Sequence, residues 1–175
     1  MLRITIIIMS ALILSACHEE DEDLNVTGMR PEYISYDELL VFEQQGPQEI
    51  VHAGKIMLYE NYVFLGEINK GVHIIDISDT LNPVNISFLK IPGNKDVTGQ
   101  DDRLYADNGP HLLILDITDI HHITMIGRSM NVFSPSEMYP REFAGYFECV
   151  NDAKGWVVGW EEGSLENPKC KTANM

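Results

Sequence analysis

The stretch Val72-His73-Ile74-Ile75-Asp76-Ile77-Ser78-Asp79 returns forty residues later as Leu112-Leu113-Ile114-Leu115-Asp116-Ile117-Thr118-Asp119. Each copy is an apolar run that ends in an Asp-Ile-Ser/Thr-Asp turn. Each also follows a second run that contains an aromatic residue, at 62–67 and at 103–108. A period near forty residues with several short strands per unit is typical of the blades of a β-propeller. The repeat therefore predicts an all-β fold made of similar sheets.

Turn residues divide each unit into four short stretches of strand-forming sequence. The signals are Glu60-Asn61, Asn82-Pro83 and Asn108-Gly109-Pro110. We expect two adjacent blades of four antiparallel strands, at about residues 50–91 and 92–132. The central runs are apolar on both faces, which indicates that both faces are covered.

The segments on either side of the two blades are less regular. Ser35-Tyr36-Asp37-Glu38 has the pattern of a capping box and predicts a helix of two to three turns. Residues 143–171 are expected to form a partial third blade, so that the propeller-like domain spans 33–171 and is followed by a tail at 172–175. Closed propellers typically have four or more blades, so this one is incomplete, and its open faces favour self-association or another partner.

The N-terminal residues have the features of an export signal. Arg3 precedes an apolar run that ends in Leu14-Ser15-Ala16-Cys17, which resembles a bacterial lipobox. We predict a lipoprotein signal peptide at 1–16, a lipid anchor on Cys17 and an acidic tether at 17–32. The alternative is an ordinary secretory peptide with a chance cysteine.

The charge of the chain excludes one class of partner and bears on the location. The formal net charge is −15, and removal of residues 1–16 leaves eleven Lys and Arg against 27 Asp and Glu, or −16. Nucleic acid is not an expected partner for so acidic a chain. The acyl anchor on Cys17 must then supply the membrane attachment. We expect a lipid-anchored protein of the bacterial cell envelope at the outer membrane, with the periplasmic or surface face undecided.

Two cysteines follow the predicted anchor, in a compartment that permits disulfides. A bond between Cys149 and Cys170 would close a loop of about twenty residues and stabilise the fold by about 3 kcal/mol in the chain-entropy picture. The alternative is two unpaired thiols or pairing to other segments. Two sulfurs this far apart do not indicate zinc.

Candidate chemical residues are few. No nucleophile or phosphate-binding motif is present, and neither a metal nor a cofactor is predicted. Asp76, Asp107 and Asp116 are the candidate acid/base carboxylates, but they recur with the repeat, and Asp76 and Asp116 are expected to accept hydrogen bonds within turns. A candidate binding rim consists of aromatic residues and one carboxylate. Its members are Tyr139, Tyr146, Trp156, Trp160 and Glu161. The alternative role of these aromatic residues is core packing of the irregular third blade.

Several of these motifs together resemble the LVIVD-repeat β-propeller lipoproteins of bacteria. The resemblance rests on Gly71 to Asp79, Asn82 to Asn85, Ile91 to Asn94 and Leu104 to Asp107, and it continues into Gly145 to Val150 and Gly155 to Glu161. It covers roughly residues 30–171 and implies a propeller fold and an envelope location, but no reaction.

The function expected from these features is that of a membrane-anchored, non-enzymatic module that binds a protein or a glycan. One alternative is a fragment of a longer LVIVD-repeat propeller without independent function. A second alternative is an envelope hydrolase that uses the aspartates named above.

Overall fold

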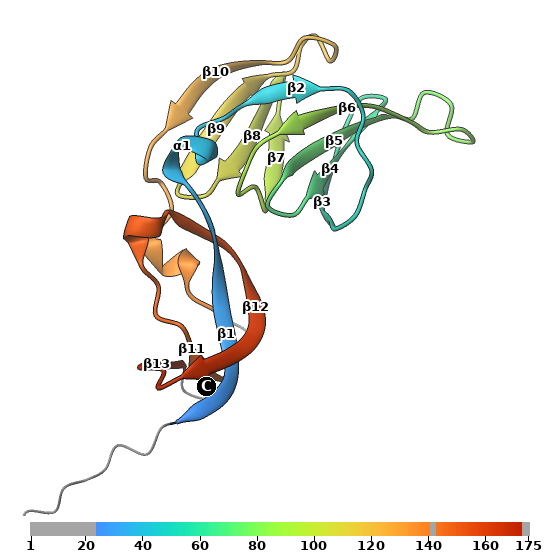
Figure 1. The fold of residues 1–175 in the computed structure, drawn as a ribbon. Helices are drawn as coiled ribbons and strands as arrows, with labels where there is room; N and C mark the ends of the chain where they lie inside the picture. Colours follow the sequence, from blue (N-terminus) through green and yellow to red (C-terminus); the bar gives the residue numbers. More distant parts are fainter. Residues whose placement is uncertain (1–23, 141–142, 173–175) are drawn as a thin grey trace, which may run out of the picture.

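The structure is a computed structural model that describes residues 24–140 and 143–172, and the described chain folds mainly into antiparallel β-sheets (Figure 1). The signal peptide, Cys17 and most of the tail lie outside the described residues. The predicted all-β class with one short helix is confirmed. Two sheets form an upper body, and a third forms a ribbon below it.

The first sheet has the strand order β2-β6-β5-β4-β3, and the second has the order β10-β9-β8-β7. The strands of the first sheet are β2 (Glu43–Gln45), β3 (Ala53–Tyr59), β4 (Tyr62–Glu67), β5 (Gly71–Asp76) and β6 (Val84–Lys90). Those of the second are β7 (Val97–Gln100), β8 (Arg103–Asn108), β9 (His111–Asp116) and β10 (Thr124–Ser129). Both predicted blades are therefore present, each with four successive antiparallel strands. The first sheet also has a fifth strand, β2, which lies outside the predicted bounds of 50–91 and pairs with β6.

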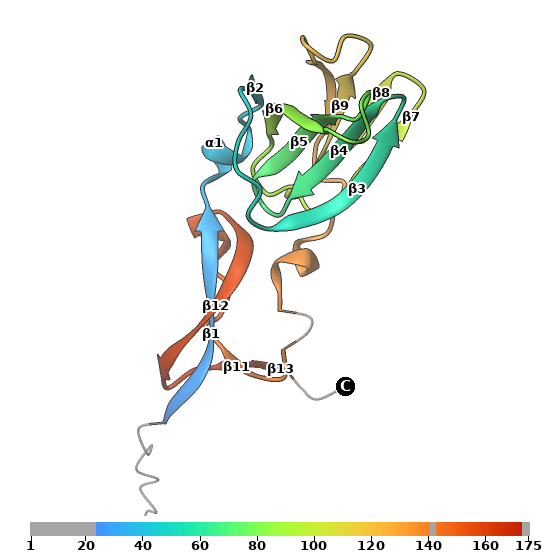
Figure 2. The same ribbon diagram turned by 90° about the vertical axis from the view of Figure 1, so that its right-hand side faces the viewer.

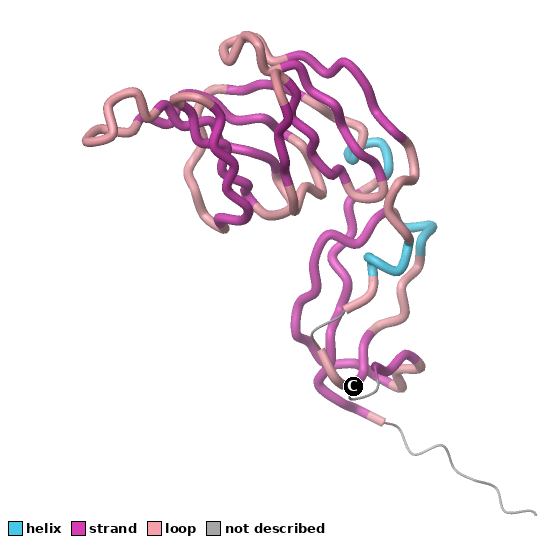
Figure 3. Tube along the Cα trace, turned by 180° about the vertical axis from the view of Figure 1, so that it is seen from behind, coloured by secondary structure: helices cyan, strands magenta, loops and turns pink. Residues whose placement is uncertain are grey.

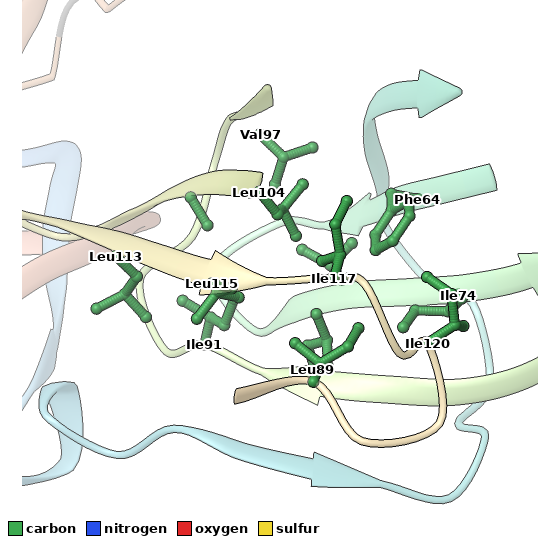
Figure 4. Close-up of a cluster of buried hydrophobic side chains, with 13 residues drawn as sticks. Phe64, Ile74, Leu89, Ile91, Val97, Leu104, Leu113, Leu115, Ile117 and Ile120 are labelled. Atoms are coloured by element: carbon green, nitrogen blue, oxygen red, sulfur yellow. The ribbon is translucent and has the colours of Figure 1, made fainter. Parts of the chain in front are cut away.

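The two sheets pack face to face around one apolar core (Figure 4). Phe64 and Ile74 from the first sheet and Leu104 and Leu115 from the second are fully buried there. Because side chains alternate between the faces of a strand, each sheet has its other face turned away from this core.

Strand β2 lies along the outer edge of the first sheet and also reaches the second. It pairs with β6, from Glu43↔Lys90 to Gln45↔Phe88. The side chain of Gln44 donates to the Ile120 carbonyl over 2.9 Å and accepts from the Ile123 amide over 2.8 Å. The strand thus fastens the outer edges of both sheets together.

The predicted helix is present but shorter than expected. The capping box at Ser35 and Glu38 is confirmed, and α1 spans Tyr36–Leu39, a single turn. Leu39 packs into the small core that includes Trp156, whereas Phe42 packs against the core between the two sheets. A continuous helix would place both residues on one face, so the chain leaves the helix between them.

The third sheet has the order β12-β1-β11-β13 and differs from the predicted third blade. Its strands are β1 (Asn25–Ile34), β11 (Gly145–Phe147), β12 (Trp156–Glu166) and β13 (Cys170–Thr172). Strand β1 pairs antiparallel with β12 along its whole length and parallel with β11 at Met29↔Phe147. Two corrections follow: residues 25–32 belong to a strand instead of the tether, and residues 143–171 need β1 to complete their sheet.

The ribbon unit, made of β1 and residues 134–140 and 143–172, meets the body near α1 (Figures 1 and 2). Two short 3₁₀ helices belong to it, η1 (Pro135–Met138) and η2 (Asp152–Lys154), and both lie in the lower unit in Figure 3. Leu39 and Trp156 both approach Gly109, which turns the chain between β8 and β9 with φ of 58°. A side chain at position 109 would strike both residues, so glycine permits the close contact there.

Candidate functional site

The face of the first sheet that points away from the second carries exposed apolar side chains. Ile56 and Leu58 on β3 are 63% and 69% exposed, and they pair with Leu65 and Val63 on β4. Val63 in turn lies opposite Ile75 on β5, and both are half-buried. We call Ile56, Leu58, Val63 and Ile75 the front patch. It presents aliphatic groups on three hydrogen-bonded strands.

The rest of this face is covered by the β2–β3 loop, residues 46–52. The carboxylate of Glu67 accepts from the amides of Val51 and His52, and Asn85 donates to the Gln48 carbonyl over 2.9 Å. Beneath the loop, His73 is fully buried, with its Nε2 at 3.2 Å from Glu67 Oε2. No local sequence pattern indicates how Glu67 holds the loop, because Glu67 and the amides that it binds lie about fifteen residues apart.

The electrostatics of Glu67 follow from these contacts. Burial by itself raises the pKa of its carboxyl. The hydrogen bonds from the two backbone amides and His73 lower the pKa by more than burial raises it, so that it lies below the usual range. Beside the pair is a cavity of about 490 Å³ with Lys70, Lys90 and Glu49 in its wall. Because the amides and His73 already occupy the carboxylate, Glu67 holds the loop in place.

The second sheet also has an uncovered face, on the side opposite the core. We call Tyr105, Leu112 and Ile114, which are half-buried there, the back patch. Tyr105 and Leu112 line a cavity of about 640 Å³, which Trp156 and Phe133 close on the side of the ribbon unit. The body therefore has one open apolar face on each side.

Asp107 lies in the wall of the same cavity and serves a structural purpose. Its Oδ1 accepts from the amides of Lys95 and Asp96 over 2.7 and 2.9 Å and from Asn94 Nδ2 over 2.8 Å. Burial raises the pKa of its carboxyl, and the amides of Asp96 and Lys95 offset part of that rise. The three bonds hold the turn that leads into β7.

The other two candidate carboxylates are engaged in their own turns, as predicted. Asp76 Oδ1 accepts from the Ser78 amide over 2.8 Å, and Asp116 Oδ1 accepts from the amide and hydroxyl of Thr118. The hydroxyl and amide bonds lower the pKa of both carboxyls. Asp116 also accepts from Arg103 over 2.8 Å. The repeated aspartates thus close the repeated turns.

The candidate rim residues do not form one surface but lie at different places within the ribbon unit. Trp160 and Tyr139 both pack edge-to-face on the buried Phe147, at 5.5 and 6.2 Å, and line one cavity of about 580 Å³. Trp156 is 5% exposed and belongs to the small core at Leu39. Tyr146 instead lies under Lys171, whose Nζ is 4.6 Å from the ring centre.

Glu161, the remaining rim residue, is exposed on β12 opposite Arg30. The structure thus brings Trp160 and Tyr139 together on Phe147, and Trp160 also packs against the small core that contains Trp156. Tyr146 and Glu161 lie elsewhere.

Cys149 and Cys170 form a disulfide in the structure, with 5.2 Å between their Cα atoms. The bond ties the end of β11 to the start of β13. Within residues 24–140 and 143–172, no three His, Cys, Asp or Glu side chains gather closely enough to hold a metal ion. Among the same residues, none of the helices has the length and apolar character needed to span a bilayer.

Comparison with known proteins supports the repeat. Residues 52–87, which run from the end of the β2–β3 loop into β6, match the family model of the LVIVD repeat. The resemblance to LVIVD-repeat proteins is thereby confirmed over this stretch. No match to a curated protein or to a solved structure was found.

Proposed function

We propose that this chain, which carries an LVIVD repeat at residues 52–87, is a lipid-anchored, non-enzymatic module that binds a protein through its front patch. The observation that carries the proposal is the exposure of Ile56 and Leu58, at 63% and 69%, on β3, the edge strand of a regular sheet. Contiguous apolar groups on a rigid surface favour association with a partner.

The chemistry of the surface favours a protein over a glycan. Sugars stack on exposed aromatic faces, but Trp156 and Phe147 are buried in the ribbon unit and Trp160 donates its indole N–H to the Met138 carbonyl. The front patch is aliphatic, and Val63 and Ile75 extend it across three strands. A partner that presents its own apolar side chains would bury this surface, as the cores of protein interfaces do.

The environment of the carboxylates supports a non-enzymatic role. A general acid or base needs access to a substrate proton. Asp76 and Asp116 have their Oδ1 atoms engaged by the Ser78 and Thr118 turns, and Asp107 accepts three hydrogen bonds on Oδ1. The hydrogen bonds that these three carboxylates accept stabilise the turns in which they lie.

A photo-crosslinking amino acid in place of Leu58 tests the binding surface in cells that make the full chain. We expect a covalent adduct between this chain and a protein. The matched control carries the same amino acid in place of Leu81, which is 88% exposed in the loop between β5 and β6 and outside the front patch. If Leu58 gives no adduct beyond the level at Leu81, the front patch is not a binding surface.

The lipid anchor is tested separately through Cys17, which lies outside the described residues. We expect Cys17→Ala to prevent labelling with radioactive palmitate and to move the chain from the membrane fraction to the soluble fraction. The net charge of the chain, −15, gives no alternative attraction to an anionic bilayer. Retention of the variant in the membrane fraction would contradict the predicted anchor.

A further inference from the structure

The central strands of the two sheets pair in the same register. Each residue on an open face of one sheet therefore has a counterpart in the other sheet that lies in the core between them. Tyr62 pairs with Asp76 as Arg103 pairs with Asp116, so β4 and β5 have the same register as β8 and β9. Val63 and Ile75 of the front patch then correspond to Leu104 and Leu115 of the second sheet.

In the second sheet the corresponding surface is covered. Leu104 and Leu115 are fully buried against the first sheet, where Phe64 and Ile74 are fully buried in the same core (Figure 4). The front of one repeat thus packs on the back of the preceding repeat inside this molecule.

The surface of the first sheet that covers Leu104 and Leu115 also has a counterpart in the second sheet, and that counterpart is open. By the same register, Phe64 and Ile74 correspond to Tyr105 and Ile114 of the back patch. The chain therefore presents, on opposite sides, the two halves of an interface that it already forms internally.

We infer that a second copy of this chain binds the front patch through its back patch and repeats the internal packing between molecules. The inference rests on the proposed function, and it names the partner. The contact is heterologous, because a front meets a back, so an open assembly keeps one free front patch at one end and one free back patch at the other until a ring closes. Propellers typically contain four to eight blades, so two sheets per copy predict a ring of about two to four copies.

Charge sets the direction of the salt effect. Two copies of the anchored chain, each with a formal charge of −16 after removal of residues 1–16, repel one another, and the aliphatic front patch offers no ion pair to offset the repulsion. Added salt screens that repulsion. We therefore expect self-association to strengthen as sodium chloride is raised from low to moderate concentration.

Variants of the full chain, purified in mild detergent, test the geometry by light scattering after gel filtration. We expect the wild-type chain to associate in a concentration-dependent way. Leu58→Asp blocks the front patch and Ile114→Asp blocks the back patch, so that each variant alone is monomeric. An equimolar mixture forms heterodimers, because each variant retains the face that the other lacks. Leu81→Asp is the matched control and associates like the wild type.

Circular dichroism checks that each variant is folded, and Tyr105→Asp replaces Ile114→Asp if the latter unfolds. A monomeric wild-type chain would overturn the inference. So would association of Leu58→Asp alone, undiminished association of the back-patch variant, weakening by salt, or failure of the two variants to combine.

The adduct at Leu58 in cells separates this inference from the proposed function. We expect an adduct of twice the chain mass whose crosslinked peptide lies within residues 103–116. An adduct with a different protein would overturn self-association and leave protein binding in place. Absence of any specific adduct would contradict both.

Discussion

Gln44 hydrogen-bonds the outer edges of the two sheets to each other. Its side chain donates to Ile120 and Ser87 and accepts from Ile123. We expect Gln44→Ala to lower the free energy of unfolding by about 1–3 kcal/mol, because the substitution leaves a backbone N–H and a carbonyl without a partner. Urea denaturation followed by circular dichroism measures the change.

The neighbouring amide supplies the control for this prediction. Gln45 donates to the side chain of Glu43, an exposed contact within its own strand. Gln45→Ala should therefore leave the unfolding midpoint almost unchanged. If the two variants lose equal stability, the effect belongs to strand β2 in general, and the bridge made by Gln44 adds nothing.

Asp107 leads to a prediction about pH. Asp107→Asn keeps an acceptor oxygen for the Lys95 and Asp96 amides and removes a carboxylate whose pKa is raised mainly by burial. A raised pKa in the folded state means that the stability contributed by Asp107 is fully present below its unfolded pKa and is lost as pH rises through the folded value. Asp107→Asn should therefore gain stability relative to the wild type between acidic and neutral pH.

Thermal unfolding at several pH values from 3 to 7 measures this difference. Asp107→Ala is the control, since it removes the charge and the acceptor together. It should be less stable than Asp107→Asn at every pH, by about 1–2 kcal/mol for the unpaired amides. A stability difference between Asp107→Asn and the wild type that does not change with pH would show that the charge is not penalised in the fold.

Contacts between residues close in the chain are predictable from the sequence. The turn roles of Asp76 and Asp116 were predictable because their partners, Ser78 and Thr118, lie two positions away. Glu67 holds Val51 and His52 across about fifteen positions, and no local pattern reports such a contact. Contacts between a side chain and a loop that is distant in the sequence can therefore be identified only from the structure.

At the scale of elements, the strands of both repeats were predictable because turn residues mark their ends. Strand β1 was not, since it follows an acidic run and contains Pro31, which is unusual in a paired strand. Pro31 fits because β11 pairs with β1 at Met29 and does not extend to it. The front patch was likewise hidden, because runs that are apolar on both faces do not reveal which face is covered.

Strand β13 leads to a prediction about the disulfide. It pairs with β11 over three residues, and the bond from Cys149 to Cys170 closes a loop with a sequence separation of 21. We expect the double substitution of both cysteines by serine to lower the stability of the ribbon unit by about 3 kcal/mol. Tryptophan fluorescence during urea denaturation measures this, since Trp156 and Trp160 both lie in β12. Reductant should shift the wild type to the same midpoint and leave the variant unchanged.

At the scale of the molecule, the body and the ribbon unit are held together near α1. Leu39 is fully buried with Met138, Trp156 and Val157 of the ribbon unit. Its carbonyl accepts from Asn108 Nδ2 of the second sheet over 2.7 Å. Leu39 thus contacts both units, since its side chain also approaches Gly93 and Gly109 of the body. We therefore expect the cooperative unfolding of the two units to depend on it.

Leu39→Ala tests that dependence. Loss of a fully buried leucine costs about 2–5 kcal/mol, and here the loss falls on the core of the ribbon unit while the Asn108 bond to the backbone remains. In the wild type we expect fluorescence from β12 and far-ultraviolet circular dichroism from all three sheets to give coincident urea curves. In Leu39→Ala the fluorescence midpoint should fall below that of the dichroism. Leu40→Ala, at a neighbouring residue that is 41% exposed, should keep the curves coincident. A parallel shift of both curves in Leu39→Ala would instead mean that the two units unfold as one without this contact.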